Sequence, residues 1–260
     1  MSEKRFANQL ALVTGASSGI GAATARAFAA EGARLIIAAR RVDRLEQMAA
    51  EMRSAHGTEV FVLELDLLKQ REAMARLEAL PPDWKTVDIL VNNAGLSRGL
   101  DKLHEGRYDD WEEMIEVNVK GLLAVSRTVI PWMVARGKGH VINIGSIAGR
   151  EVYPGGNVYC ASKFAVRAIN RGMAIDLVGT PIRVTTIDPA LTETEFSLVR
   201  YRGDAKRAAA PYQGLRALSG EDIADAILWA ASRPAHVNVS EMVIYPTAQR
   251  SATIVHRNDS

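Results

Sequence analysis

The stretch LALVTGASSGIG, from Leu10 to Gly21, decides the fold. Its apolar start predicts a buried strand, and three glycines at the spacing G-x3-G-x-G lead into a run with helical period. Glycines there allow a tight turn and close approach of a diphosphate, which the free N–H groups of the helix N-terminus attract. We therefore predict a phosphate-binding loop, with a glycine turn that binds nothing as the alternative. Its expected contacts are Gly15, Ser17, Ser18, Gly19, Ile20 and Gly21.

The same alternation of strand and helix continues along the chain. The predicted strands are Leu10–Val13, Arg34–Ala39, Val60–Leu65, Asp88–Asn93, His140–Gly145, Ile182–Ile187 and Glu241–Pro246, and helices are expected to begin near Gly19, Val42, Lys69, Asp109, Asn157 and Gly220. Strand runs that are apolar on both faces are typical of parallel sheets covered by helices. We predict an α/β protein with a single domain over residues 1–260, a Rossmann-type doubly wound parallel sheet of seven strands with helices on both faces.

Composition excludes several classes of function. The 260 residues are 48% hydrophobic, and 32 basic against 30 acidic residues form no charge run that would indicate a nucleic-acid or membrane surface. The single cysteine rules out an internal disulfide, and neither CxxC nor HExxH is present to build a familiar metal site. The first residues lack the apolar core of a signal peptide. We expect a soluble cytoplasmic protein without a metal.

The end of the second predicted strand indicates which dinucleotide binds. A carboxylate there would hydrogen-bond the ribose and repel a 2′-phosphate. The chain instead has Arg40 and Arg41, with Arg44 one helical turn further on. Guanidinium groups suit phosphate, so we predict NADP rather than NAD; solvated arginines at a helix start are the alternative.

The segment YCASK places Tyr159 four residues before Lys163, on one face if the segment is helical. A phenol works as a proton donor best when its pKa lies near the operating pH. Lowering its pKa from about 10 to about 7 requires roughly 4 kcal/mol. A cation about 4 Å away supplies that at an effective dielectric near 20, but only about 1 kcal/mol in bulk water. The interpretation as an acid–base pair therefore depends on burial.

Together these motifs resemble the short-chain dehydrogenases/reductases over essentially the whole chain. TGASSGIG resembles their cofactor loop, NNAG (Asn92 to Gly95) their fourth-strand signature, and Asn118, Ser146, Tyr159 and Lys163 their catalytic tetrad. DILVNNAGL, PGGNVY, PAHVN and IVHR resemble the branch of NADP-dependent 3-hydroxy acid (serine) dehydrogenases, to which sulfoacetaldehyde reductases are similar. Two positions depart from the pattern: Ala190 replaces the glycine after the sixth strand, and Cys160 follows the tyrosine.

The resemblance implies roles for these residues. Tyr159 is the acid in reduction and the base in oxidation, Lys163 lowers its pKa and holds the nicotinamide ribose, Ser146 hydrogen-bonds the substrate oxygen, and Asn118 fixes a water behind Lys163. Thr192 or Thr194 reaches the nicotinamide carboxamide. The remaining implied cofactor contacts are Asp66, Leu67, Asn93, Ala94, Gly95, Pro189 and Leu191.

An acidic substrate would need a cation, and Arg150, Arg200 and Arg202 are the candidates, of which we favour Arg150 or Arg200. Ser146, Tyr159, Tyr153 and Asn157 are expected to form the rest of the substrate site. The long irregular segment 190–213 is typical of a substrate lid, and 247–260 forms a C-terminal tail that could cross to a neighbouring subunit.

The leading hypothesis is an NADP(H)-dependent oxidoreductase that interconverts a short 3-hydroxy acid, of the serine or 3-hydroxypropionate type, and its oxo acid or semialdehyde. The alternatives are an NADPH-dependent sulfoacetaldehyde reductase that forms isethionate, a broad-specificity carbonyl reductase, and a non-catalytic nucleotide-sensing protein. The segments 111–135 and 158–178 are apolar on more than one face, and the resemblance implies that they pair in a homotetramer.

Overall fold

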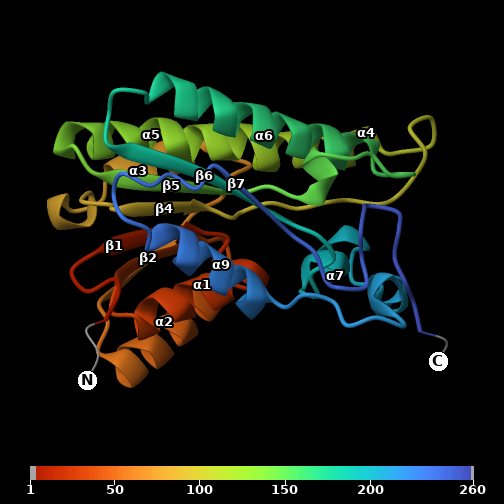
Figure 1. Cartoon of the computed structure of the whole chain (residues 1–260), viewed down its shortest axis with the longest axis horizontal. Coiled ribbons are helices and arrows are strands. Elements are labelled where there is room, and N and C mark those ends of the chain that lie inside the picture. The colour runs from red at the N-terminus through yellow and green to blue at the C-terminus, as the bar shows by residue number, and fades with distance from the viewer. Residues whose placement is uncertain (1–3, 259–260) are drawn as a thin grey trace.

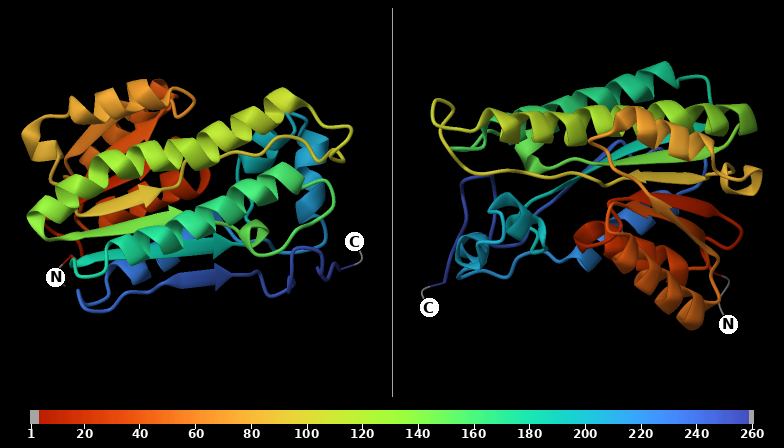
Figure 2. Two further views of the ribbon diagram at one scale, coloured as in Figure 1. Left: turned by 90° about the horizontal axis from the view of Figure 1, so that it is seen from above. Right: turned by 180° about the vertical axis from the view of Figure 1, so that it is seen from behind.

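The computed structural model describes residues 4–258 and has three layers, with helices on both faces of one sheet (Figures 1 and 2). The strands are β1 (Leu10–Thr14), β2 (Arg34–Ala39), β3 (Val60–Glu64), β4 (Ile89–Asn92), β5 (Gly139–Ile144), β6 (Ile182–Pro189) and β7 (Glu241–Ile244). All pairings are parallel, in the order β3-β2-β1-β4-β5-β6-β7. The predicted fold class is confirmed.

The helices divide between the two faces of the sheet. They are α1 (Gly19–Ala30), α2 (Val42–His56), α3 (Gln70–Glu78), α4 (Tyr108–Ile115), α5 (Leu122–Arg136), α6 (Asn157–Asp176), α7 (Phe196–Arg200), α8 (Ala205–Ala209) and α9 (Gly220–Ala231). In Figure 1, α1, α2 and α9 lie below the sheet, and α4, α5 and α6 lie above it. Each face has its own apolar core, because the strand residues alternate between the two. No helix in residues 4–258 is long and apolar enough to cross a membrane.

The order in which strands are added to the sheet reverses beside β1, and this reversal positions the site. From β1 the chain moves outward to β2 and β3, then returns to place β4 on the other side of β1. Loops that leave neighbouring strands in opposite directions open a crevice at the carboxyl ends of the strands, where doubly wound sheets bind ligands. The loops that follow β1 and β4 are the two predicted cofactor motifs.

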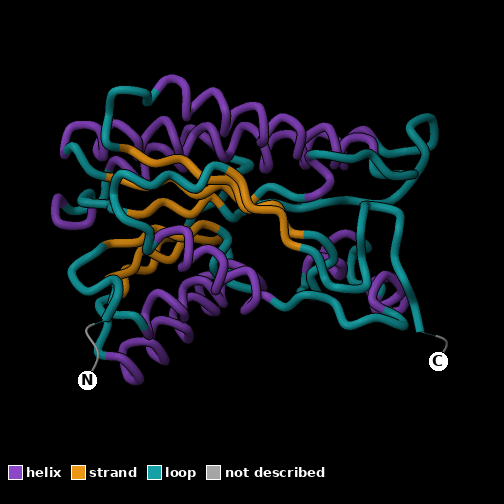
Figure 3. The backbone as a smooth tube through the Cα atoms, viewed as in Figure 1, coloured by secondary structure: helices purple, strands orange, loops and turns teal. Residues whose placement is uncertain are grey.

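The predicted lid is not wholly irregular. Segment 190–213 contains α7, α8 and a 3-10 turn over Ala210–Tyr212, and it lies beyond the carboxyl ends of the strands, where Figure 3 shows it as short helices joined by loops. The described part of the tail packs against this segment in the same chain: Leu191 N donates to Gln249 Oε1 (2.9 Å), and Arg257 Nη2 donates to Pro211 O (3.1 Å). These contacts lie within one chain, so a crossing of the tail to a neighbour stays a prediction; residues 259 and 260 lie outside the described part.

His140 on β5 makes the stability of this fold sensitive to acid. It is 1% exposed, and its Nε2 lies 2.7 Å from Thr185 Oγ1 on β6. Burial, assisted by Arg183, lowers the pKa of His140 to about 3. The unfolded chain therefore binds one more proton than the folded chain below about pH 6.5. Stability falls from that pH down towards pH 3, by up to about 1.4 kcal/mol per pH unit from this residue.

We predict that His140→Gln flattens this acid limb. Glutamine does not titrate and can still hydrogen-bond Thr185, so the free energy of unfolding, measured in urea, should decline less between pH 6 and pH 4 than it does in the wild type. His236→Gln, at an exposed position, is the matched control and should follow the wild type. Parallel curves for His140→Gln and the wild type would contradict the assignment.

Candidate active site

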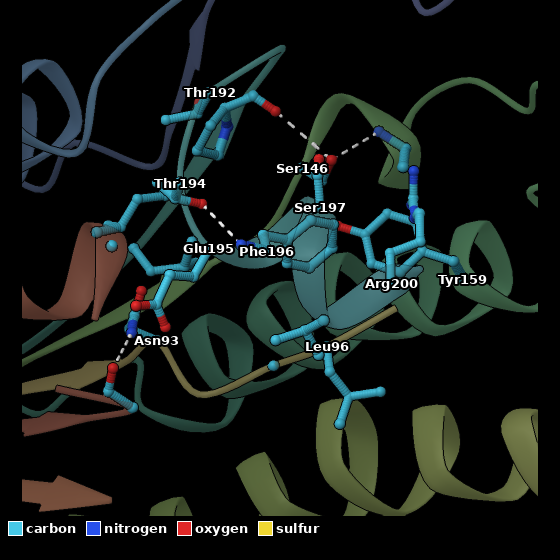
Figure 4. Close-up of a pocket in the computed structure, with 18 of the residues that line it drawn as sticks. Asn93, Leu96, Ser146, Tyr159, Thr192, Thr194, Glu195, Phe196, Ser197 and Arg200 are labelled. Atoms are coloured by element: carbon cyan, nitrogen blue, oxygen red, sulfur yellow. Dashed lines mark hydrogen bonds between the residues drawn. The ribbon is translucent and has the colours of Figure 1, made fainter. Parts of the chain in front are cut away.

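One large cavity, of about 680 Å³, lies at the carboxyl ends of the central strands and brings the predicted motifs together (Figure 4). It extends from the loop after β1, past the loop after β4, to the lid and the tail. Most of the predicted site residues line it; the exceptions are Gly21, Arg44, Asn118, Arg150, Asn157 and Arg202. Residues from opposite ends of the sequence thus share one crevice.

The loop after β1 fits an anionic diphosphate. Gly15 has φ +65°, and a Cβ there would lie 2.8 Å from Ala94 Cα, so only glycine permits this approach of the two loops. Gly21 lies beneath the loop, where a Cβ would meet Asn93 Nδ2 and Gly15 O, both at 2.4 Å, so its role is packing rather than ligand contact. The first turn of α1 carries no acidic residue, and the N-cap Ser18 makes no side-chain capping bond. Free N–H groups and hydroxyls therefore face the cavity.

The arginines at the end of β2 differ in their surroundings. Arg41 lies on the phosphate loop and donates to Ser17 Oγ (3.0 and 3.1 Å) and to Ser18 Oγ (2.7 Å). Arg40 is exposed at the cavity wall. Arg41 and Arg44 both bind the carboxylate of Glu195, a lid residue that sequence reasoning did not single out.

Tyr159 lies at the centre of the cavity, on α6, and is 9% exposed. The Phe196 ring packs beside it, with ring centroids 5.6 Å apart, and the Arg200 guanidinium carbon lies 5.1 Å from its ring centroid (Figure 4). Burial, with a smaller contribution from Tyr153, raises the pKa of Tyr159; the Arg200 cation and a hydrogen bond from Ser146 act against this rise. The phenol is therefore held protonated.

Lys163, one turn along α6 from Tyr159, is 6% exposed, and its Nζ donates to Ile144 O at 2.9 Å. Burial lowers the pKa of Lys163 to about 8, while the buried carboxylate of Asp188 favours the charged form. We expected Lys163 to be the cation that lowers the pKa of Tyr159. That role stays a prediction: here Arg200 and Ser146 are the groups that lower the pKa of Tyr159, and the Lys163 ammonium donates to the carbonyl at the end of β5.

Asn118 lies in a π-helical turn, Glu116–Gly121, which joins α4 to α5. Its side chain donates to Leu96 O (2.8 Å) and Ser162 Oγ (3.0 Å), and its Oδ1 accepts from Leu96 N (2.8 Å). The amide therefore fixes the loop after β4 against α6, and the expected water behind Lys163 stays a prediction. π-Helical turns of this kind are frequent at functional sites.

Two predicted substrate contacts lie elsewhere. The Arg150 guanidinium pairs with Asp188 (2.6 Å) and with Glu241, so both carboxylates hold it away from the cavity. Asn157 is the exposed first residue of α6 and lines a smaller, separate cavity. Tyr159 borders both cavities, whereas Asn157 does not border the large one. Both predictions of substrate contact were wrong in placement.

Comparisons with known proteins identify the family. The family model for short chain dehydrogenase matches residues 9–202. The chain belongs to this family. It is similar to an NADP-dependent 3-hydroxy acid dehydrogenase of Salmonella typhi, with 43% identity over 96% of this chain and 100% of that protein. It is also similar to an NADP-dependent 3-hydroxy acid dehydrogenase of Schizosaccharomyces pombe, with 39% identity over 98% of this chain and 99% of that protein.

Solved structures agree. The closed form of serine dehydrogenase complexed with NADP+ superimposes with a TM-score of 0.89 at 42% identity, covering 96% of this chain and all of that one. An alcohol dehydrogenase from the archaeon Thermococcus sibiricus, complexed with 5-hydroxy-NADP, gives 0.82 at 31% identity, over 93% of this chain and 98% of the other. The predicted family is confirmed.

Sequence reasoning missed several residues in this short-chain dehydrogenase site. Ser97, after β4, accepts from Arg200 Nε (3.0 Å), and Glu195 meets the arginines of β2 and α2. Gln249 and Arg257 bring the tail to the cavity wall. These residues lie in loops without a strand or helix pattern, so no sequence signal placed them, although the length of the lid indicated that it served the site.

We predict that Arg150→Ala acts on stability rather than on substrate binding. It leaves Asp188, which is 1% exposed, with only the Thr186 hydroxyl as a side-chain partner. The free energy of unfolding should fall by about 2 kcal/mol, below the cost of breaking a fully buried pair because Arg150 is partly exposed. Urea unfolding measures this, while the Michaelis constant for carbonyl substrates stays near that of the wild type.

The matched control is Arg171→Ala, which removes a more exposed arginine from Glu241. It should cost less than about 1 kcal/mol. If Arg150→Ala instead raised the Michaelis constant with unfolding unchanged, Arg150 would belong to the substrate site after all.

Proposed function

We propose that this chain is an NADP(H)-dependent oxidoreductase that interconverts a short 3-hydroxy acid and its oxo acid or semialdehyde. The observation that carries the proposal is a buried, protonated phenol, Tyr159, with a serine and an arginine beside it, in the cavity that begins at the phosphate loop. The relatives named above, dehydrogenases with NADP in their names or in their complexes, support the cofactor and the reaction class.

Each residue performs one task in carbonyl reduction. NADPH supplies the hydride when it is bound. Tyr159 supplies the proton to the carbonyl oxygen, since burial keeps that proton on the phenol until an acceptor is close. Ser146 donates a hydrogen bond to the same oxygen, and Lys163 holds the ribose hydroxyls beside α6. In oxidation the phenolate of Tyr159 accepts the proton, and the Arg200 charge favours that phenolate form.

The cofactor contacts follow the length of the cavity. Arg40, Arg41 and Arg44 would hold the 2′-phosphate, Asp66 and Leu67 the adenine, and the loop after β1 the diphosphate. Of the two lid threonines, Thr194 packs on the phosphate loop, since a Cβ on Gly19 would lie 3.0 Å from its Cβ. Thr192 also lines the cavity, so we assign Thr192 to the nicotinamide carboxamide.

Arg200 is the anchor we propose for an acidic substrate. Its guanidinium donates to Tyr153 Oη (2.9 Å) and Ser97 Oγ (3.0 Å), both neutral partners. Within residues 4–258 no carboxylate lies in salt-bridge range of it, in contrast to Arg150 and Arg202. A guanidinium with its charge uncompensated can still bind a carboxylate or sulfonate. A sulfonate would suit the same group, so sulfoacetaldehyde reduction is the second candidate.

Replacement of the phenol tests the chemistry. Tyr159→Phe should lower kcat for NADPH-dependent reduction by at least about a hundredfold, the usual scale of a general acid. The Kd for NADPH, followed by quenching of protein fluorescence, should change little, because the ring and its packing on Phe196 remain. Retention of more than about a tenth of the wild-type rate would mean that another group supplies the proton.

Replacement of the proposed anchor tests the substrate class. Arg200→Gln should lower kcat/KM for malonic semialdehyde and sulfoacetaldehyde at least about tenfold more than for propanal, since only the acids lose a charge-assisted hydrogen bond. Arg202→Gln, which removes the nearby cation paired with Asp110, is the control and should leave this ratio unchanged. Equal losses on acids and on propanal would favour the broad carbonyl reductase, and absence of turnover on the whole panel would favour a nucleotide sensor.

We also propose a homotetramer in the cytoplasm. Leu123 and Val134 on α5, and Phe164 and Ile175 on α6, are exposed apolar residues. Burial of these faces against a second copy would remove them from water. Light scattering after size exclusion would decide the assembly state.

A further inference from the structure

The lid contacts the proposed 2′-phosphate site through one carboxylate. Glu195 Oε2 lies 2.8 Å from Arg41 Nη1, and Arg44 Nη1 lies 2.7 Å from Oε1 and 3.0 Å from Oε2. These arginines come from the end of β2 and the first turn of α2, more than 150 residues earlier in the chain. The two cations beside the phosphate loop thus already carry an anion supplied by the protein.

Each of the three guanidinium nitrogens of Arg41 donates to a partner within the protein. Nη1 goes to Glu195, while Nε and Nη2 go to the hydroxyls of Ser17 and Ser18. Arg41 lowers the pKa of Glu195, and Arg44 lowers it further, so the carboxylate is ionised at neutral pH and is not released by protonation. A phosphate that approached Arg41 and Arg44 would meet a like charge within a few ångströms, and like charges repel strongly at that range.

We infer that Glu195 is a specificity-determining residue whose carboxylate competes with the cofactor 2′-phosphate for Arg41 and Arg44. This rests on the proposed function, because it assumes that these arginines receive the phosphate of NADP(H). NADP(H) displaces the carboxylate, and part of its binding free energy is spent on that exchange. NAD(H), which lacks the phosphate, leaves the carboxylate on the arginines.

The exchange has consequences for the reacting end of the cavity. Glu195 immediately precedes α7, and the first and last residues of that helix, Phe196 and Arg200, lie against the Tyr159 ring. Release of Glu195 frees the end of the helix nearest the phosphate loop. The same five-residue helix therefore connects the group that recognises the phosphate with the groups that cover the catalytic phenol.

Binding of nucleotide fragments tests the competition without turnover. Calorimetric Kd values would be measured for 2′,5′-ADP, which carries the discriminating phosphate, and for 5′-AMP, which lacks it. Glu195→Gln should lower the Kd for 2′,5′-ADP by about fivefold, the effect expected for loss of a partly exposed ion pair. The Kd for 5′-AMP should not change. Glu195→Ala should shift both values in the same way.

Glu193→Gln is the matched control. Glu193 is exposed on the same loop, lies outside the cavity, and has no side-chain ion pair in the described chain. Its loss removes one negative charge from the lid, and both Kd values should stay at the wild-type level. Thermal unfolding of each variant confirms that the fold is kept.

The outcomes separate cleanly. An unchanged or raised Kd for 2′,5′-ADP in Glu195→Gln would overturn the competition, and the second result would mean that Glu195 orients the arginines for the phosphate. An equal gain for 5′-AMP, or the same gain in Glu193→Gln, would reduce the effect to general charge and also overturn it. Failure of the wild type to bind 2′,5′-ADP more tightly than 5′-AMP, or to turn over any carbonyl with NADPH, would instead remove the proposed function.

Discussion

The structure depends on the hydrogen bonds that join the ends of β1 and β4, where the strand order of the sheet reverses. Thr14 Oγ1 accepts from Asn93 N and Ala94 N (both 3.1 Å), and Asn93 Nδ2 donates to Thr14 O (2.9 Å). These bonds satisfy backbone groups that would otherwise be exposed at the ends of the strands. They also bring the loop after β4 so near Gly15 that no side chain fits there. The crevice follows from this join, because the loops can then leave only in opposite directions.

The distribution of buried charge decides which cation remains available in the crevice. Behind β5 and β6, Asp188 and Glu241 bind Arg150, with Arg167 and Arg171 at the edge. Burial alone would raise the pKa of Glu241, but Arg150 and Arg171 outweigh it and lower that pKa to about 2. The negative charges of Asp188 and Glu241 are thus compensated by arginines of the same network. Arg200 has only hydroxyl partners, so it alone among the three arginines weighed for the substrate keeps its charge directed to the cavity.

The elements that obey short-range rules were predictable. The period of the apolar runs predicted the strands to within about two residues, and the glycine spacing predicted the turn from β1 into α1. The error at Arg150 has a different origin: its distance from Ser146 in sequence was right for the site, but Glu241, some ninety residues away, determines where its side chain goes. Glu195 was missed for the same reason. Ion pairs between distant segments leave no periodic trace, so the sequence identifies which charges exist and the fold decides which of them are paired.

Under the proposed function, the position of Arg200 links substrate binding to the protonation state of Tyr159. Arg200 lies beside the Tyr159 ring and favours the phenolate, whereas burial favours the phenol and prevails. An anionic substrate bound to Arg200 would compensate its charge and weaken the one cation that favours the phenolate. Tyr159 would then hold its proton more firmly, and the proton would transfer only when negative charge develops on the substrate oxygen. The same guanidinium that selects an acid would thereby keep the tyrosine protonated for its reduction.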